Sequence, residues 1–397
     1  MPHGRDPLRA ADVRKRNEKI VLRLIHTEGG RGLSQSEAVL ATGLKAPTIF
    51  RIFSNLETAG LIGNLPSPAA PAARADAKNE RKGRRPSVFV VRRTAHAIIG
   101  VEFWASRVSI GVFDFLGGEL SSRVLPLKAG MDAEGVCALI GDLVDAAIAE
   151  LGLERGKVLG LGLGAPGQVN VRTRTVTFYP RTPGFVDFPI ASRLERRLGL
   201  PVTVHNNCSV IALSEFRYRG LAADGPMFMF LLRSGVNGAF VDAGRIHLTS
   251  EGATIEMGHL PVDVDGPACS CGAKGCLEAC LAALDPQNLD EGGSLFESLG
   301  TALGSGHGEQ AEKVLGRAAI HLAQAVRIAC GLFSPRSVLF VATSPVVAET
   351  LAARVRDVVA REGSGFGRTL PEFHARAYDP VLAQRGAAAL VLDAFLS

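Results

Sequence analysis

Residues Cys269 to Glu278 read Cys-Ser-Cys-Gly-Ala-Lys-Gly-Cys-Leu-Glu, and this segment decides how the rest of the chain is interpreted. It places three cysteines within eight residues, the first of them ten residues beyond His259. Thiolates and imidazole are the ligands that zinc prefers, and the intervening glycines let the chain fold back on itself. The spacing therefore predicts a zinc site whose ligands are His259, Cys269, Cys271 and Cys276.

The expected zinc is structural, because four protein ligands leave no position for an activated water. The cysteines could instead be small buried hydrophobic residues, but packing alone hardly explains three of them so close together. Cys280 lies one helical turn beyond Cys276 and could replace His259 as the fourth ligand. A thiol that faces the core is the favoured role for Cys280.

The length and composition indicate an ordered protein of two or three domains. The chain has 397 residues, of which 47% are hydrophobic. No apolar run reaches the ~18 to 20 residues that a membrane span needs, and the N-terminus lacks the apolar segment of a signal peptide. Seven cysteines, an odd number with most in one cluster, fit a reducing compartment. We therefore expect a cytoplasmic protein with no membrane contact.

The net charge of +5 is unevenly distributed along the chain. Residues 1–95 hold 18 Lys and Arg against 8 Asp and Glu, whereas the remainder holds 26 against 31. A basic segment concentrates near phosphates through counterion release, and an acidic one is repelled. Contact with nucleic acid is therefore expected at residues 1–95, although on charge alone a solvated basic face is an alternative.

Residues 1–95 also carry the pattern of a helix-turn-helix. Apolar residues at helical spacing predict a first helix over 13–28, which ends at Gly29-Gly30. Ser34 and Glu37 have the spacing of a capping box at the start of a short second helix. A third helix is predicted over 46–59. The second and third helices, joined by a tight turn, would let the third enter the major groove of DNA.

Two predicted strands, 60–62 and 86–91, would form a wing next to these helices. The Pro/Ala-rich segment 66–77 lies between them, and a run of basic residues follows it. Residues 1–95 are thus predicted to be a winged helix-turn-helix domain that binds double-stranded DNA. The residues expected to contact DNA are Lys45, Thr48, Phe50, Arg51, Arg84 and Arg85.

Beyond residue 95, strands alternate with helices, which predicts an α/β fold. Strands are expected at 98–103, 108–112, 124–127, 158–163 and 202–205, with helices at 133–151 and 190–198. A second lobe repeats this scheme, with a helix at 209–218, strands at 227–232, 238–241 and 338–341, and a long helix at 312–332. Residues 96–397 thus form one domain of two lobes. Lobe 1 is about 96–205 plus the C-terminal helix 382–397, and lobe 2 is about 206–381.

Several separate motifs resemble the ROK family of repressors and sugar kinases. Residues 269–278 resemble its CxCGxxGCxE signature, and residues 256–259 resemble its loop that contacts sugar and binds zinc. Residues 164–167 are similar to the family's substrate-side turn, and residues 200–207 resemble the segment that carries the Asn-Asp pair of the kinases. The resemblance covers nearly the whole chain. It implies an actin-like (ribonuclease-H-like) domain with a sugar-sized cleft between two lobes.

The resemblance also indicates where this chain departs from the kinases. The kinases carry Asp-x-Gly-Gly-Thr where this chain reads Glu102-Phe103-Trp104-Ala105-Ser106, so side chains fill a turn that should admit a phosphate. The Gly-rich turn at 233–238 and the adenine-side glycines at 342–344 are altered as well. Asn207 stands at the position of the catalytic base, and a neutral amide cannot accept a proton as a carboxylate does. We therefore expect no enzymatic activity.

The motifs that resemble the family's sugar-contacting segments are intact in this chain. Carboxylates, an amide and an imidazole suit the hydroxyl groups of a sugar, and a zinc-bound imidazole can offer its second nitrogen to a ligand. The residues that match sugar contacts in the family are Asn206, Glu256, His259 and Glu278. Without a ligand, the two glutamates would be ordinary surface residues and Asn206 would be a cap at a strand end.

These observations predict a transcriptional repressor of carbohydrate metabolism genes. Residues 1–95 would bind a DNA operator, and the zinc-containing domain, residues 96–397, would sense a sugar or sugar derivative without phosphorylating it. The resemblance implies that the large domain also forms a homodimer. One alternative is a regulator controlled by a protein partner, with the cleft as scaffold only. An ATP-dependent sugar kinase is the less favoured alternative.

Overall fold

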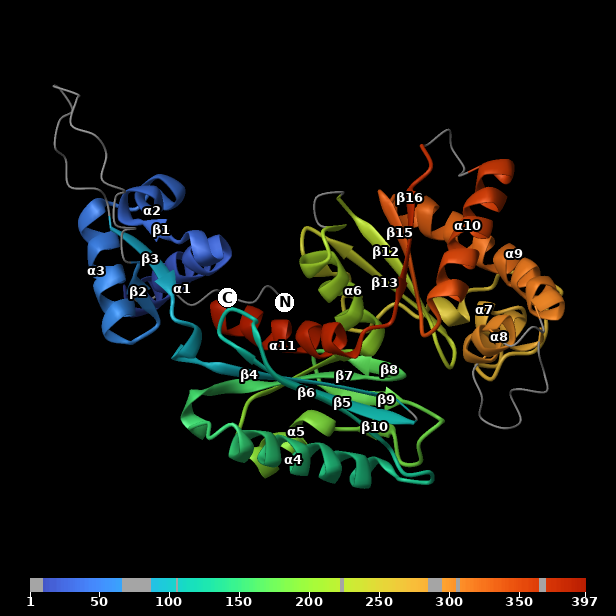
Figure 1. Ribbon diagram of the computed structural model, residues 1–397, viewed down its shortest axis with the longest axis horizontal. Coiled ribbons are helices and arrows are strands. Elements are labelled where there is room, and N and C mark those ends of the chain that lie inside the picture. The colour runs from blue at the N-terminus through green and yellow to red at the C-terminus, as the bar shows by residue number, and fades with distance from the viewer. Residues whose placement is uncertain are drawn as a thin grey trace, which may run out of the picture.

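The computed structural model describes residues 10–65, 87–104, 106–221, 225–284, 295–304, 308–363 and 369–397. A small N-terminal domain, which we call the head (described residues 10–65 and 87–91), is followed by two α/β lobes, and the C-terminal helix lies between them (Figure 1). Arg84, Arg85 and the Pro/Ala-rich segment 66–77 lie outside the described residues. In the part of the chain described here, no helix is both long enough and apolar enough to cross a membrane.

The head consists of three helices and a small antiparallel sheet of order β1-β3-β2. The Ser34 hydroxyl accepts a hydrogen bond from the Glu37 amide at 3.2 Å, and the Glu37 carboxylate accepts one from the Ser34 amide at 2.8 Å. The predicted capping box is therefore confirmed. Gly43 ends the second helix with φ of 68°, a conformation that glycine adopts without strain. The elements are α1 (Ala10–Glu28), β1 (Leu33–Ser34), α2 (Gln35–Thr42), α3 (Ala46–Thr58), β2 (Ile62–Asn64) and β3 (Val88–Val91).

The first lobe is built on a five-stranded sheet of order β11-β7-β4-β5-β6. Its strands are β4 (Ala97–Trp104), β5 (Arg107–Asp114), β6 (Glu119–Pro126), β7 (Val158–Ala165) and β11 (Val202–Asn206). The first three strands pair antiparallel, and β4, β7 and β11 run parallel. Helices α4 (Ala133–Glu150) and α5 (Ile190–Leu198) cover one face. Three short strands, β8 (Gln168–Asn170), β9 (Thr175–Phe178) and β10 (Val186–Phe188), form a small separate sheet.

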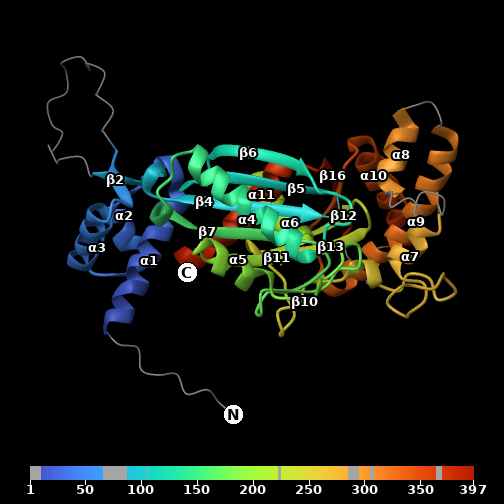
Figure 2. The ribbon, with the colours of Figure 1, turned by 90° about the horizontal axis from the view of Figure 1, so that it is seen from below.

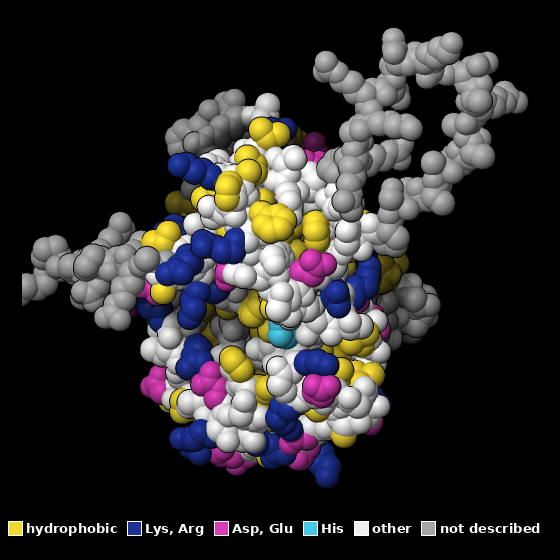
Figure 3. Space-filling view, turned by 90° about the vertical axis from the view of Figure 1, so that its left-hand side faces the viewer, with side chains coloured by type: hydrophobic (Ala, Val, Ile, Leu, Met, Phe, Trp, Pro, Cys, Tyr) yellow, Lys and Arg dark blue, Asp and Glu magenta, His cyan; other side chains and the backbone are white. Residues whose placement is uncertain are grey.

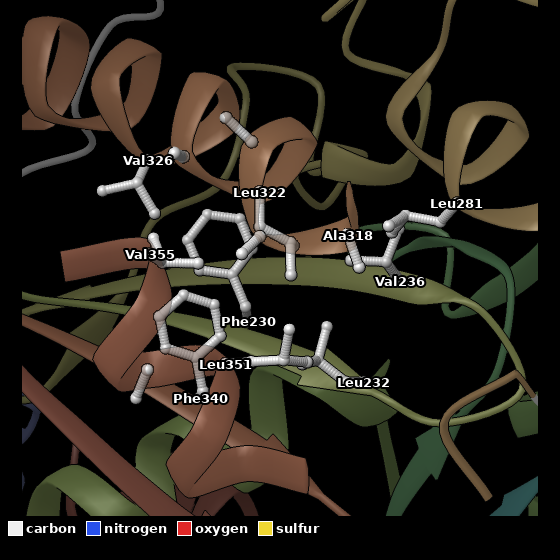
Figure 4. Packing of buried hydrophobic residues seen from close by; sticks show 14 of the residues in the cluster. Phe230, Leu232, Val236, Leu281, Ala318, Leu322, Val326, Phe340, Leu351 and Val355 are labelled. Atoms are coloured by element: carbon white, nitrogen blue, oxygen red, sulfur yellow. The ribbon is translucent and has the colours of Figure 1, made fainter. Parts of the chain in front are cut away.

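The second lobe repeats this sheet, in the order β14-β13-β12-β15-β16. Its strands are β12 (Met227–Leu232), β13 (Val236–Asp242), β14 (Arg245–Ile246), β15 (Ser337–Ala342) and β16 (Glu372–Ala377), and their directions match those of the first sheet. The outer face is covered by α7 (Leu277–Ala282), α8 (Leu295–Gly304), α9 (Gly308–Phe333) and α10 (Pro345–Glu362). Figure 4 shows Phe230 and Phe340 of this sheet packed below Leu322 of α9 and beside Leu351 of α10.

Helices α6 (Asn207–Tyr218) and α11 (Pro380–Leu396) lie between the two sheets (Figures 1 and 2). Their close approach requires glycine at three positions. A side-chain carbon would come within 1.9 Å of a backbone oxygen of α11 at Gly100 and Gly162, and within 2.0 Å of one of α6 at Gly386. The same helix also reaches the head, because one buried cluster contains Ile25 of α1 and Leu392 of α11. Helix α11 therefore contacts both lobes and the head.

The α/β, two-lobed, actin-like fold expected from the sequence is confirmed, including the repeated scheme in the second lobe. Most predicted strands and helices agree with the structure to within a few residues. The sequence analysis did not identify β1, β8, β9, β10, β14, β16, α8 or α10. Of these, α10 had a readable signal, since Ser344 caps it and Pro345 opens it.

We predict that Gly162→Ala will destabilise the protein, because the added methyl group must push α11 away from β7. Overpacking of this kind lowers the free energy of unfolding by about 1–3 kcal/mol or more. Gly331→Ala, at an exposed position of α9 with open space around it, is the matched control. It should raise helix stability by up to about 1 kcal/mol. Thermal melting followed by circular dichroism checks both, and an unchanged melting temperature for Gly162→Ala would contradict the packing argument.

Candidate functional site

A pocket of about 410 Å³ opens between the two lobes. This is the size range of small-molecule sites in proteins. The first lobe contributes the last residue of β4, residues that follow β7, and residues at and after the end of β9. The second lobe contributes the turn after β12, the 3-10 turn Met257–His259 with the residue before it, and residues of the cysteine loop and α7. Its polar lining residues include Gln168, Arg181, Asn207, Arg233, Asn237, Glu256, His259 and Glu278.

Three of the four predicted sugar contacts, Glu256, His259 and Glu278, share one wall of this pocket. Burial raises the pKa of Glu256 to about 8, and the neighbouring Glu278 carboxylate acts in the same direction. The Thr254 hydroxyl donates a hydrogen bond of 3.4 Å to Glu256 and opposes this shift. This wall therefore offers two carboxyl groups and an imidazole to a ligand rich in hydroxyl groups.

Asn206 lies differently from the sequence-based expectation. It is 1% exposed, and its side-chain nitrogen donates a 2.6 Å hydrogen bond to the Gly167 carbonyl. Its side-chain oxygen accepts a 2.8 Å hydrogen bond from the Cys208 amide, which caps α6. Asn206 is not among the residues that line the pocket, and Asn207 is. The amide available at this corner of the pocket is therefore that of Asn207.

The four predicted metal ligands come together beside this wall. One ligand atom from each of His259, Cys269, Cys271 and Cys276 lies within 4.8 Å of all the others. The Cys271 and Cys276 sulfurs are 3.7 Å apart, and Nδ1 of His259 is 3.4 Å from the Cys269 sulfur. Zinc–sulfur bonds of about 2.3 Å in a tetrahedron place two sulfurs about 3.8 Å apart. The residues present therefore fit a tetrahedral metal ion, and Nε2 of His259 remains for other contacts.

The backbone of this loop brings the ligands together through a tight hairpin. Isolated bridges pair Pro261 with Cys276 and Ala268 with Lys274. Gly275 has φ of 68°, and a side-chain carbon there would lie 1.5 Å from the Asp263 carbonyl oxygen. Only glycine fits this position. Cys280 is buried on α7, next to the cluster but outside it.

A buried ion pair lies at the end of β4, the segment that resembles the Asp-x-Gly-Gly-Thr turn of the kinases, and its arginine lines the pocket. The Arg233 guanidinium donates a 2.8 Å hydrogen bond to Oε1 of Glu102. Arg233 is 5% exposed and Glu102 is fully buried. Burial lowers the pKa of Arg233, but Glu102, together with Tyr378 and Cys208, raises it above its ordinary value. Arg233 is therefore expected to stay charged although it is buried.

Two aromatic rings surround this ion pair. The carbon at the centre of the Arg233 guanidinium lies 4.3 Å from the centroid of the Trp104 ring and 4.7 Å from that of Tyr378. The Tyr378 hydroxyl donates a 2.9 Å hydrogen bond to Oε2 of Glu102. Both carboxylate oxygens thus have a donor, which a buried carboxylate requires.

The sequence analysis did not identify Arg233 or Tyr378 as partners of Glu102. A weak signal existed for Arg233, because an arginine directly after the six buried residues of β12 has no ordinary place in a core. Nothing in the sequence pairs it with a glutamate 131 residues earlier.

The described residues predicted to contact DNA lie at the start of α3. Lys45 caps this helix without a side-chain hydrogen bond to it, and Thr48 is half-buried. Phe50 is 64% exposed, and Arg51 is exposed. Figure 3 views this end of the molecule and shows Lys and Arg side chains next to hydrophobic ones on its surface. The start of α3 therefore presents a mixed cationic and apolar face.

Curated relatives with two kinds of activity match parts of the chain. A putative xylose repressor of Caldicellulosiruptor sp. is 27% identical over 200 residues, which are 50% of this chain and 50% of the repressor. A glucokinase of Streptomyces coelicolor is 30% identical over 182 residues, which are 45% of this chain and 54% of the enzyme. The chain thus matches about half the length of these relatives.

A solved structure and a family profile extend over more of the chain. The crystal structure of a ROK family transcriptional regulator, described as a homologue of the E. coli MLC protein, superposes with a TM-score of 0.77 at 19% identity. It covers 97% of this chain and 98% of its own, and at this identity it shows a shared fold. The ROK family profile matches residues 98–394. Because that match spans most of its length, the chain belongs to the ROK family.

Proposed function

We propose that this protein is a DNA-binding transcriptional repressor of carbohydrate metabolism genes, whose two-lobed domain senses a sugar without phosphorylating it. The observation that carries this proposal is the Arg233–Glu102 pair, whose arginine lines the pocket beside Trp104. Glu256 and Glu278 also line the pocket, and their carboxyl groups are available to a ligand. A ROK domain that retains the residues for sugar contacts but places its own side chains where a phosphate would bind is suited to binding a sugar and not to phosphoryl transfer.

The DNA-binding part of the proposal assigns residues 1–95 to a winged helix-turn-helix and residues 96–397 to the sensor. Helix α3 would enter the major groove, since its exposed start carries Arg51 and Phe50. An arginine can bind guanine or phosphate, and a phenylalanine can contact the methyl group of thymine. The strands β2 and β3 would form the wing, and Arg84 and Arg85 between them would contact phosphates. A homodimer would place two such heads on paired half-sites of an operator.

The sugar-sensing part assigns Glu256, His259 and Glu278 to the hydroxyl groups of the ligand. Asn207 replaces Asn206 in this proposal, because Asn207 lines the pocket and Asn206 caps α6. A structural zinc on His259, Cys269, Cys271 and Cys276 would hold the His259 ring in place.

The absence of kinase activity is proposed on two grounds. Asn207 stands where the kinases have a carboxylate base, and an amide cannot accept the proton of a sugar hydroxyl at neutral pH. Trp104 and Arg233 together occupy the side where a phosphate would have to lie. A nucleotide would have to displace a buried ion pair, which is costly.

We predict that Arg51→Ala weakens binding to DNA from the region upstream of the gene, measured by gel shift. Loss of one contact to a base or phosphate should cost about 1–3 kcal/mol, which is about 5- to 150-fold in affinity. Arg361→Ala, an exposed cation on α10, is the matched control and should bind as the unmodified protein does. Equal loss in both variants would contradict a specific role for α3. If the intact protein failed to bind specifically, the repressor proposal itself would be contradicted.

We predict that D-xylose or D-glucose, the sugars in the names of the two relatives, binds the pocket and changes operator affinity. Isothermal calorimetry measures the binding, and gel shift with and without sugar measures the effect. Glu256→Ala should lower sugar affinity about 2- to 12-fold, because burial keeps this carboxyl group largely protonated at neutral pH and a hydrogen bond between uncharged groups contributes ~0.5–1.5 kcal/mol. Glu251→Ala, an exposed acid outside the pocket lining, should leave it unchanged.

Two results would contradict parts of the proposed function. If a wide sugar panel gave no binding heat while operator binding persisted, control by a protein partner would replace sugar sensing. Sugar-dependent release of ADP from Mg-ATP would overturn the proposed lack of kinase activity.

We predict one zinc ion per chain, measured by plasma mass spectrometry on the purified protein. Cys276→Ser should lose the ion and lower the melting temperature, because the metal stabilises only the folded loop. Cys280→Ser is the matched control, since it removes a neighbouring buried thiol outside the cluster, and it should keep the ion. The assignment of Cys276 fails if its serine variant retains a full complement of zinc.

A further inference from the structure

The buried ion pair joins the two lobes to each other. Glu102 belongs to β4 in the first sheet, whereas Arg233 follows β12 in the second. Tyr378 follows β16, also in the second sheet, and its hydroxyl reaches the other oxygen of Glu102. One carboxylate of the first lobe is therefore held by two donors of the second lobe.

The geometry of this contact is restrictive. The Arg233 guanidinium packs against the rings of both Trp104 and Tyr378, which also contact each other edge to face with their centroids 5.4 Å apart. A planar guanidinium held by a carboxylate and two rings has few alternative positions. A buried charge that loses its partner is strongly unfavourable, so the contact is expected to be either fully formed or fully broken.

The same residues form part of the ligand pocket. Trp104 and Arg233 both line it. The turn that begins at Arg233 continues to Gly235, where an added side-chain carbon would lie 2.6 Å from a carboxylate oxygen of Glu278. Arg181 of the first lobe also donates a 2.6 Å hydrogen bond to the Ser234 carbonyl of this turn. A molecule in the pocket would therefore contact the residues that join the lobes.

A continuous set of packed elements leads from this contact to the head. Glu102 lies on β4, and β4 packs directly under α11. The C-terminal part of α11 shares a buried cluster with α1, in which Leu392 and Ile25 are members. His26 of α1 also makes a 2.8 Å hydrogen bond with the Phe115 carbonyl, just after β5. A change in how the lobes are joined would thus reach the head through packed structure.

We propose that Glu102, Arg233, Tyr378 and Trp104 form an interlobe latch, and that a ligand in the pocket controls DNA binding by making or breaking this latch. The proposal rests on the proposed function for its link to DNA. It specifies which residues rearrange between the lobes when a ligand binds, and neither the family membership nor the sugar contacts specify these residues. The latch occupies the place that a phosphate would take in a kinase, so the lobes are bridged by the protein's own charges.

The test compares the double variant Glu102→Gln/Arg233→Met with the unmodified protein. Replacing both partners of a buried ion pair by uncharged residues of similar size is often tolerated, whereas removing one is not. Non-cysteine spin labels at Ala149 on α4 and Glu349 on α10 report the distance between the lobes by electron paramagnetic resonance. Both positions are exposed. We expect a broader distance distribution in the double variant, and operator affinity changed at least about 5-fold.

Two further variants keep the test decisive. Arg123→Met/Glu150→Gln removes an exposed Arg–Glu ion pair that lies wholly within the first lobe, and it should leave distances and operator affinity unchanged. Tyr378→Phe removes only the hydroxyl that binds Glu102, and it should broaden the distances less than the double variant does. If the double variant does not fold, Tyr378→Phe decides the question, because a distance distribution no broader than that of the unmodified protein would then overturn the latch.

The outcomes separate the latch from the proposed function. An unchanged distance distribution in the folded double variant overturns the latch. A broadened distribution with unchanged operator affinity overturns its control of DNA binding. If the unmodified protein binds no DNA, the proposed function fails, while the label distances still decide whether the latch exists.

Discussion

The close packing of helix α11 is the constraint on which the rest of the structure depends. Gly100 and Gly162 let this helix lie directly on two strands of the first sheet, and Gly386 lets α6 approach it from the other side. Because these contacts are between backbones, no side-chain rearrangement can loosen them gradually. Both lobes and the head therefore share one rigid element, and a change at the interlobe pocket has a physical path to the DNA-binding end.

The carboxyl groups at the pocket differ in whether their hydrogen-bond partners come from the protein. On one side, Glu102 is satisfied internally by Arg233 and Tyr378, so this buried carboxylate makes its contacts within the protein. On the other side, Glu256 and Glu278 face the pocket, and burial raises the pKa of Glu256. Carboxyl groups that line a cavity can make further hydrogen bonds, which a ligand rich in hydroxyl groups, such as a sugar, supplies. In the proposed function, Trp104 and Arg233 occupy the position of a phosphate, and Glu256 and Glu278 are available to the hydroxyl groups of the ligand.

The sequence predicted the parts of this structure that rest on local pattern. Periodicity identified the buried strands and most of the long helices, although not α10, and the spacing of the cysteines predicted the cluster at residues 269–276. Short strands such as β8 were missed because three residues are too few to show the alternation of apolar and polar residues that indicates a strand. The choice between Asn206 and Asn207 was also beyond the sequence, since it depends on which amide caps α6. The pairing of Glu102 with Arg233 depends on the packing of two lobes, and no local signal encodes it.

The loop from Met257 to Cys276 shows how a structural metal ion would matter to the pocket. This loop supplies one wall of the pocket, yet it contains only one short 3-10 turn and isolated bridges. Backbone of this kind is easily displaced, and a displaced wall would bind ligand weakly because it must be ordered first. A tetrahedral ion on His259 and the three cysteines would tie both ends of the loop together. The Nε2 atom of His259 would then be held at a fixed place in the pocket, so that ligand binding energy is available to move the lobes instead of ordering the wall.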